Sequence, residues 1–276
     1  MLRELDRMTF DEVEAYLKTD PGILVFPLGS TEEHGTHGPM GTDTFTARLV
    51  SRLVAQRLDA VVAPALPYGM ACDQTSFKGT VTLKPTTLAL IMRELCENFI
   101  RDGYRLVLVI SGHRGNDFAA MTGIEEAGFN ANTHFLYMCY QDANRGRLAE
   151  VLGPEMAAHI RPDDQRYGAD GHGGSIELSI AMAHAPGSVR MEKRRRPDRT
   201  AADVLRSFPF KTTLSIEEYA PTDGFFGDPS LCSEQLGQQV AERTADRIAA
   251  EVKRYLAEFP SRTKRSARLE KERRPS

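Results

Sequence analysis

Carboxylate and imidazole side chains gather in one glycine-rich segment that follows an apolar stretch. Over 29–43 the chain reads GSTEEHGTHGPMGTD, which contains Glu32, His34, His37 and Asp43. A divalent ion needs several deprotonated oxygen or imidazole donors that converge at about 2.0–2.2 Å, and a carboxylate can bridge two ions. The composition of this segment therefore predicts a metal site.

The spacing within the segment indicates which donors face each other. Residues two apart in an extended chain point to the same side, so we expect Glu32 and His34 to face one point while Glu33 faces away. Asp43 returns from the far end of the segment, directly before a run with helical periodicity. Thr42 or Asp43 could instead act as a helix N-cap, and this structural interpretation stays open beside metal binding.

Two more clusters of the same kind lie far along the chain. The apolar, β-branched run 105–110 is typical of a buried strand, and it places His113 at its carboxyl end, where α/β folds carry their sites. Between Asp170 and Ser179, His172 and Glu177 flank a glycine pair, and a helix is expected to begin inside this motif. One such cluster would more often be a turn with a satisfied histidine, but three are hard to explain structurally.

Together these motifs resemble the creatininase family of metal-dependent amidohydrolases. The matching positions are Gly29, Ser30, Glu32, His34, Gly35, His37, Thr42, Asp43, Ser111, Gly112, His113, Asn116, Asp170, His172, Gly173 and Glu177. Two lesser stretches, 67–83 and 227–231, are also similar to the family. The resemblance extends from about residue 22 to about residue 258, and its first motif is highly specific.

The resemblance implies a binuclear site for two divalent metal ions, Zn²⁺, Mn²⁺ or Fe²⁺, which activates a water to attack an amide or related carbonyl carbon. Two cations about 3.5–4 Å apart lower the pKa of a bound water and polarise the carbonyl, so no protein nucleophile is required. By the same resemblance, Glu32, Asp43 and His113 would surround one ion. His34 and Glu177 would hold the other, with Asp43 bridging the two.

Further roles follow for residues around the expected ions. His172 is assigned to proton transfer, because an unperturbed imidazole pKa of about 6.5 suits the donation of a proton to a departing nitrogen. Glu177 is counted with it as catalytic. The residues expected to contact substrate are Arg114, His37, Asp170 and Tyr68.

The chain departs from the family's namesake enzyme in two places. That enzyme covers its flat cyclic substrate with tryptophans, whereas this chain has none, which argues against the same substrate. Arg114 and Gly115 stand where that enzyme has a tyrosine and a glutamate ligand, so Glu177 would fill the gap, and a single-metal site stays open. A guanidinium there suits a carboxylate or phosphate, which predicts an anionic substrate. A structural salt bridge with Asp117 or another acid is the alternative.

Three functions stay open at this point. The first is an amidohydrolase that acts on a small polar amide, lactam or formamide. The second is a ring-opening hydrolase that cleaves a carbon–carbon bond of an oxidised cyclitol of the dehydro-inosose type with the same metal site. Release of ammonia, an amine or formate would separate these two. The third is a non-catalytic metal-binding protein, and a peptidase, also known among relatives, would need an open groove.

Composition sets limits on partners and location. The chain has 276 residues, 41% of them hydrophobic, a net charge of −3 and four cysteines without a C-x-x-C pair. It lacks the strong basic excess of nucleic-acid-binding proteins, a membrane-spanning apolar run and a signal pattern. We therefore expect a cytoplasmic protein with a small-molecule substrate, no nucleic acid and no membrane. The resemblance adds a homo-oligomer, often a hexamer.

Apolar patterns alternate between strand and helix, which predicts a three-layer α/β/α sandwich with a mostly parallel central sheet. Strands are expected at 22–28, 60–65, 105–110 and 133–138, and helices at 10–18, 45–58, 87–101, 117–127 and 235–258. We expect a single domain over 1–260 and a basic, disordered tail over 261–276. The Arg- and Pro-rich stretch 186–221, with the basic run 193–199, is expected to cap the site or to meet another subunit.

Overall fold

The computed structural model describes residues 2–18, 22–129, 131–144, 150, 171–195, 213–220, 223–225 and 227–260. Within them, five strands form one sheet in the order β1-β3-β2-β4-β5, and every pair is parallel. The strands are β1 (Arg3–Glu4), β2 (Ile23–Leu28), β3 (Val61–Val62), β4 (Leu106–Ser111) and β5 (His134–Cys139). Asp170, residues 196–212 and 221 of the predicted excursion and the tail 261–276 lie outside the described residues.

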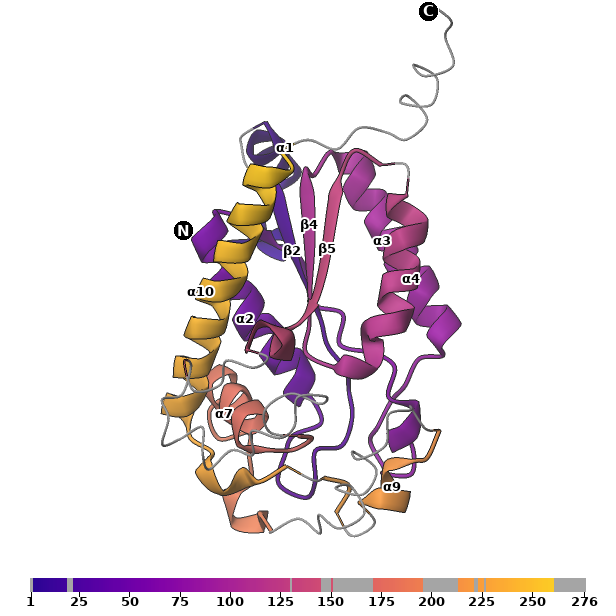
Figure 1. Cartoon of the computed structure of the whole chain (residues 1–276), viewed down its shortest axis with the longest axis vertical. Helices are drawn as coiled ribbons and strands as arrows, with labels where there is room; N and C mark the ends of the chain where they lie inside the picture. The colour runs from indigo at the N-terminus through magenta and orange to yellow at the C-terminus, as the bar shows by residue number, and fades with distance from the viewer. Residues whose placement is uncertain are drawn as a thin grey trace, which may run out of the picture.

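Helices cover both faces of the sheet (Figure 1). One face carries α2 (Thr42–Leu58), α7 (Ser175–His184) and α10 (Glu234–Glu258), and the other carries α3 (Pro85–Asp102) and α4 (Asp117–Gly128). The remaining described helices are α1 (Phe10–Leu17) and α9 (Ile216–Tyr219). Short 3-10 helices span Leu5–Arg7, Cys72–Gln74, Arg114–Asn116, Tyr140–Asn144, Met191–Lys193 and Pro229–Leu231. The predicted three-layer α/β/α architecture is confirmed.

The two central strands are apolar on both sides because both faces of the sheet are covered. Every residue of β2 and β4 is buried, as expected for parallel strands between helical layers. Alternate side chains enter different cores: Val25 packs with the α2, α7 and α10 side, and Phe26 packs with the α3 and α4 side. Two separate hydrophobic clusters therefore pack on opposite faces of the strands that lead into the polar motifs.

The register of the two central strands sets the position of those motifs. Ile23 pairs with Leu106 and Leu28 pairs with Ser111, so both strands end at the same level. Gly112 continues this pairing, because its N–H donates to the Leu28 carbonyl over 2.9 Å. The segments that follow β2 and β4 consequently leave the sheet side by side.

Most expected elements are found within three residues of their predicted bounds, but the strand expected at 60–65 is shorter. β3 covers only Val61–Val62, and the chain meets β2 again at an isolated bridge between Leu28 and Leu66. Pro27 has no N–H group to donate to this ladder, and the ring of Pro64 fixes its backbone φ, so regular pairing does not continue. The two-residue strand β1 was not predicted, because two residues show no periodicity.

The long C-terminal helix α10 packs as its sequence predicts. Ala241, Ala245, Ile248 and Val252 recur at steps of four and three and are all buried, which is the stripe of an amphipathic helix on a sheet. Within the part of the chain that the structure describes, no helix combines the length and the apolar character that crossing a bilayer requires.

Candidate metal centre

The predicted donors meet at the carboxyl ends of β2 and β4. In Figure 1 the segments after these strands run toward α7, which supplies the third cluster. Three sets of donors each have ligand atoms within 4.8 Å of one another. These sets are Glu32, Asp43 and His113; His34, Asp43 and Glu177; and Glu32, His34 and His172. The structure thus brings together all six residues that sequence analysis assigned to the ions and to proton transfer.

One pair of sets shares a single carboxylate. His113 Nδ1 lies 3.0 Å from Glu32 Oε1 and 3.6 Å from Asp43 Oδ2. On the other side, His34 Nε2 lies 3.4 Å from Asp43 Oδ1 and 3.5 Å from Glu177 Oε2. Ligands at about 2.0–2.1 Å from a tetrahedral ion are about 3.3–3.4 Å apart, so both spacings suit a metal. Asp43 presents one oxygen to each set, as a bridging carboxylate does.

Buried ligand atoms that make no hydrogen bond provide a test of whether a cation fits between these side chains. Glu32 and His34 are 0% exposed and Asp43 is 1% exposed. His34 Nε2 and Asp43 Oδ2 are buried and make no hydrogen bond. Buried polar atoms are rarely left unsatisfied, because each costs free energy without a partner. His34 Nε2 and Asp43 Oδ2 belong to different donor sets, and a divalent ion in each set would satisfy the atom that faces it, so the residues present fit a metal.

Each imidazole is held by one nitrogen, which leaves the other turned toward the centre. The carbonyl of Met70 lies 2.9 Å from His113 Nε2, so Nδ1 faces the first set. The Glu32 carbonyl lies 3.2 Å from His34 Nδ1, so Nε2 faces the second set. Metal-binding histidines characteristically donate their other N–H to a carbonyl or carboxylate, which fixes the ring and the tautomer.

The carboxylates are oriented in the same way. Ser30 Oγ donates to Glu32 Oε2 over 2.6 Å, and the buried Gln74 side chain donates to Glu32 Oε1 over 2.9 Å. The N–H of Gly173 donates to Glu177 Oε2 over 2.9 Å. Sequence analysis missed Gln74, because it lies in a mostly exposed segment and only its contact with Glu32 reveals its role.

Helix geometry also favours acidic groups here. Asp43 is the second residue of α2, and Glu177 is the third residue of α7. The N-cap of α2 is Gly41, and no side chain caps this end. The interpretation of Thr42 or Asp43 as an N-cap is therefore wrong, because the helix begins earlier than the apolar periodicity indicates. Both carboxylates lie in a first turn, where the helix dipole favours negative charge.

The charged side chains of the centre strongly shift the pKa values of one another. Burial lowers the pKa of His113, but the carboxylates of Glu32 and Asp43 outweigh it and raise the pKa to about 10. Burial and the charge of Glu32 raise the pKa of Asp43 to about 6. Burial raises the pKa of Glu32, yet His113 and His34 hold it below its usual range. Without a metal, this cluster retains protons that a cation would displace.

Comparison with known proteins identifies the family. The family model for creatininase, described as creatinine amidohydrolase, matches residues 6–252. The chain belongs to the creatininase family. It is therefore a hydrolase of that family, as the resemblance of its motifs predicted.

Three relatives show how broad this family is. The creatinine amidohydrolase of Pseudomonas putida is 26% identical over 262 residues, which cover 92% of this chain and 96% of that protein. The mycofactocin precursor peptide peptidase of Mycobacterium tuberculosis (strain ATCC 25618 / H37Rv) is 27% identical over 248 residues, 86% and 87% of the two chains. The 3-dehydro-scyllo-inosose hydrolase of Thermotoga maritima is 28% identical over 267 residues, 92% and 84% of the two.

Solved structures of creatininases share the fold. One described as the manganese form has a TM-score of 0.78 and 24% identity, and it covers 94% of this chain and 100% of its own. Another, a mutant creatininase described as the Zn-Zn type, has the same TM-score, identity and coverage of this chain and covers 99% of its own. The predicted α/β fold class is confirmed by this likeness.

Arg114 is already paired in the structure of this creatininase-family chain. Its guanidinium reaches Asp142 Oδ1 at 2.9 Å and Asp117 Oδ2 at 3.5 Å. The salt bridge with Asp117 or another acid, the alternative to anion binding, is thus present. Binding of an anionic substrate group by Arg114 stays a prediction, and it would have to compete with two carboxylates.

The other residues expected to contact substrate are placed in different surroundings. His37 is fully buried, its Nε2 lies 3.3 Å from the Gly173 carbonyl, and its ring packs edge-on against Phe225. Burial lowers the pKa of His37. Tyr68 is 45% exposed. Contact of either residue with substrate stays a prediction, and Asp170 lies outside the described residues.

The contact between Glu33 and His172 is the clearest one that sequence analysis missed. Glu33 stands outside the three donor sets, as the alternation predicted. It is nonetheless only 4% exposed, and its Oε1 lies 3.1 Å from His172 Nε2. Alternation along one segment cannot reveal this contact, because His172 arrives from 139 residues further along the chain.

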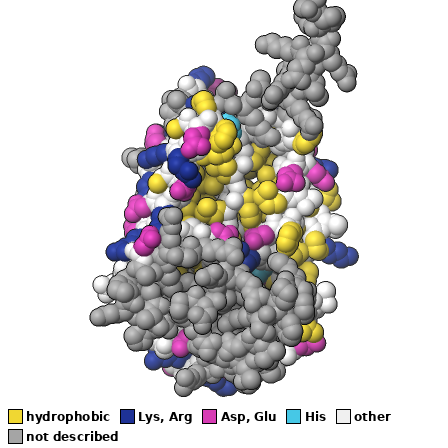
Figure 2. Space-filling model, in the orientation of Figure 1, with side chains coloured by type: hydrophobic (Ala, Val, Ile, Leu, Met, Phe, Trp, Pro, Cys, Tyr) yellow, Lys and Arg dark blue, Asp and Glu magenta, His cyan; other side chains and the backbone are white. Residues whose placement is uncertain are grey.

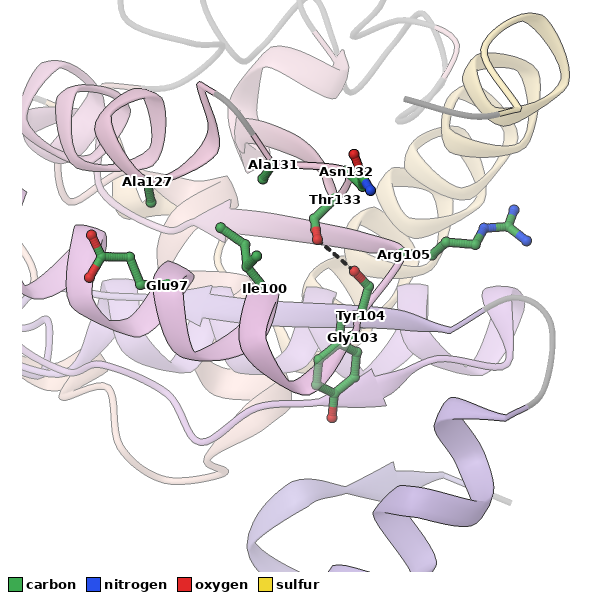
Figure 3. A pocket seen from close by; sticks show the side chains of 9 residues that line it. All are labelled: Glu97, Ile100, Gly103, Tyr104, Arg105, Ala127, Ala131, Asn132 and Thr133. Carbon is green, nitrogen blue, oxygen red and sulfur yellow. Dashed lines mark hydrogen bonds between the residues drawn. The ribbon is translucent and has the colours of Figure 1, made fainter. Parts of the chain in front are cut away.

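Two other cavities lie away from the metal centre. One of about 510 Å³ opens at the amino-terminal ends of β4 and β5, where Thr133 Oγ1 donates to the Tyr104 carbonyl over 2.8 Å (Figure 3). A groove of about 300 Å³ lies between β5 and α10, and apolar side chains gather over it in Figure 2. Neither is lined by any of the six converging residues.

Proposed function

We propose that this chain is a two-metal hydrolase that uses water to cleave the C–N bond of a small polar amide, lactam or formamide. The observation that carries the proposal is the pair of donor sets that share Asp43. A shared carboxylate between two sets with metal-like spacing is typical of a two-ion site. The family membership supports hydrolysis, and the substrate class is our own inference.

The residues that would hold the ions are those of the two sets. Glu32, Asp43 and His113 would bind one ion, and His34, Asp43 and Glu177 the other. When bound, two divalent ions lower the pKa of a water and polarise a carbonyl oxygen. Imidazole and carboxylate donors suit zinc, manganese and iron alike.

Proton transfer is proposed for His172, with Glu177 as a second catalytic group. His172 Nδ1 lies 3.9 Å from Glu32 Oε1 and therefore at the edge of the first set. An imidazole in this position can hold a proton and give it to the departing nitrogen. Because Arg114 is paired with two acids, we do not require the substrate to be anionic.

A second candidate is the opening of a carbocyclic ring by cleavage of a carbon–carbon bond. The likeness to the hydrolase named for 3-dehydro-scyllo-inosose favours it, at 28% identity over 92% of this chain. The same site would serve both reactions, because each begins with attack of water on a polarised carbonyl. The two differ in whether a nitrogen leaves, so the products separate them. A peptidase activity, the one named for the mycobacterial relative, would require room for a chain.

The test begins with the metal content of the purified wild-type protein and the Asp43→Ala variant, measured by inductively coupled plasma mass spectrometry. We expect about two ions per chain in the wild type, as in two-metal sites. The loaded protein is then screened on amides and cyclic ketones, with detection of ammonia, amines and formate. His172→Gln should retain the ions and lose turnover. No bound zinc, manganese or iron after reconstitution would instead favour a non-catalytic protein.

We also propose that the chain forms a homo-oligomer in the cytoplasm and does not bind nucleic acid or membranes. The net charge of −3 supports the absence of a nucleic-acid partner. Light scattering of the metal-loaded protein at several concentrations tests assembly, and a mass of one chain at all of them would contradict it.

A further inference from the structure

We propose that Glu33 is a positioning residue that orients His172, so that Nδ1 of this ring faces the metal centre. The consequence for turnover rests on the proposed hydrolase function, whereas the geometry of the pair does not. A buried carboxylate, Glu33, and an imidazole whose side chain is 11% exposed, His172, come together here from segments far apart in the chain.

One nitrogen of the His172 ring faces Glu33. His172 Nε2 lies 2.7 Å from the Glu33 carbonyl and 3.1 Å from Glu33 Oε1, so one nitrogen faces two acceptors of one residue. The nitrogen that faces acceptors carries the proton, and this sets the tautomer of the ring. The ring also packs against His34, and the centroids of the two rings are 4.3 Å apart. Nδ1 is then the nitrogen on the side of Glu32, at 3.9 Å from its Oε1.

The Glu33 carboxylate is itself held in place. Glu33 is 4% exposed, and its Oε2 accepts a hydrogen bond from the N–H of Gly35 over 2.8 Å. A Cβ atom at Gly224 would lie 2.4 Å from Oε2, so the glycine there makes room for the carboxylate. The side chain thus lies in a fitted backbone cradle. Burial of a carboxylate is costly unless it is paired, and here the described partners are Gly35 and His172.

The two hydrogen bonds of the side chain suit a glutamate at position 33. Both oxygens accept hydrogen bonds, Oε2 from the backbone of Gly35 and Oε1 from His172. A glutamine has the same size but carries an NH₂ group in place of one oxygen. In either orientation of the glutamine amide, this NH₂ group would face a donor, the N–H of Gly35 or that of His172. A glutamine oxygen at the Oε2 position would still accept from Gly35, but the NH₂ group would then face His172 Nε2, which would retain only the backbone carbonyl of residue 33, at 2.7 Å, as its acceptor.

The experiment measures the His172 ring directly. Protein with ¹⁵N-labelled histidine is loaded with zinc, and the His172 signals are assigned through His172→Gln. We expect a proton on Nε2 that exchanges slowly with water in the wild type. In Glu33→Gln and Glu33→Ala its exchange should be faster, on the order of tenfold or more, because a hydrogen bond to a charged group is lost. Asp73→Asn, at an exposed carboxylate, is the control and should match the wild type.

Two results would overturn the inference. One is a slowly exchanging proton on Nδ1 in the wild type, and the other is unchanged exchange in both Glu33 variants. If Glu33→Ala does not fold, Gly224→Ala is the second variant, because its added methyl group would displace the carboxylate of Glu33 while the glutamate remains. It should give the same faster exchange.

The measurement also separates this inference from the proposed function. Zinc content should be the same in wild type, Glu33→Gln and the control, because Glu33 stands outside the donor sets. A wild type that binds no zinc, manganese or iron contradicts the hydrolase proposal, yet the exchange of the Nε2 proton in the metal-free protein still tests Glu33. With a substrate found by the screen, we expect kcat of Glu33→Gln to fall about 10- to 100-fold with little change in KM.

Discussion

At the residue scale, Asp43 is the side chain on which the centre depends most. It is 1% exposed and faces both His34 and His113. We predict that Asp43→Ala lowers the metal content from about two ions per chain to less than one, because each donor set loses one member and the bridge is gone. Mass spectrometry after removal of metal and reloading with zinc measures this.

A matched control comes from the same protein. Asp73 is an exposed carboxylate outside the donor sets, so Asp73→Asn should retain the wild-type metal content. Two ions per chain in Asp43→Ala would contradict the shared-carboxylate interpretation. Loss of metal in both variants would point to a general effect on folding.

A second residue-scale prediction concerns pH. Burial lowers the pKa of His113, but Glu32 and Asp43 raise it from 6.5 to about 10 in the folded, metal-free protein. A group with a raised folded pKa stabilises the fold fully below its unfolded pKa and loses this contribution as pH rises through the folded value. The free energy of unfolding of the metal-free wild type should therefore fall relative to His113→Gln between pH 6.5 and about 10.

Urea unfolding of both proteins at intervals across this window provides the measurement. The difference between wild type and His113→Gln should be largest near the acidic end and should shrink toward pH 10. A difference that grows with pH would show that the imidazole is not held in its charged form.

The six converging residues could be predicted because their chemistry is visible locally. Glycine-flanked histidines and acids after apolar runs indicate metal ligands, and motif resemblance connects the three segments. Glu33 and Gln74 could not be found this way. Their roles depend on partners brought close only by the fold, His172 for Glu33 and Glu32 for Gln74.

At the element scale, the position of α7 decides where Glu177 lies. Gly237 of α10 allows this approach, because a Cβ there would lie 1.8 Å from the Ser179 carbonyl of α7. We predict that Gly237→Ala costs about 1–3 kcal/mol of unfolding free energy through overpacking. It should also weaken binding at the set that contains Glu177. Thermal unfolding and zinc titration measure the two effects.

Gly123 offers a control of the same kind on the opposite face of the sheet. A Cβ at Gly123 of α4 would lie 2.1 Å from the Ala89 carbonyl of α3, and neither helix contributes a residue to the three metal-donor sets. Gly123→Ala should therefore destabilise the fold by a similar amount and leave zinc affinity unchanged. Equal zinc affinity in both variants would show that α7 does not depend on this contact.

Elements were predictable where periodicity is long and unbroken. The stripe of α10 and the buried runs of β2 and β4 are of this kind. The start of α2 was placed too late, because Thr42 and Asp43 are polar residues that do not continue the apolar periodicity. The strand near residue 60 was predicted too long, because its apolar run hides the effect of the prolines.

At the scale of the whole molecule, the metal centre connects segments that extend beyond the two hydrophobic clusters. Its donors come from the segment after β2, the first turn of α2, the segment after β4 and the start of α7. The register of β2 and β4 brings two of these segments side by side. The remaining cost is repulsion among buried carboxylates, which protons reduce and a cation would neutralise.

Metal binding should therefore stabilise the whole fold. A ligand that binds only the folded state at 100 times its dissociation constant adds about 2.7 kcal/mol to the free energy of unfolding. We predict that zinc raises the thermal midpoint of the wild type and that a chelator reverses the rise. Asp43→Ala should lose this increment. Gly123→Ala should start lower and retain it, because its defect lies far from the ions. An increment retained in Asp43→Ala would mean that zinc acts at another site.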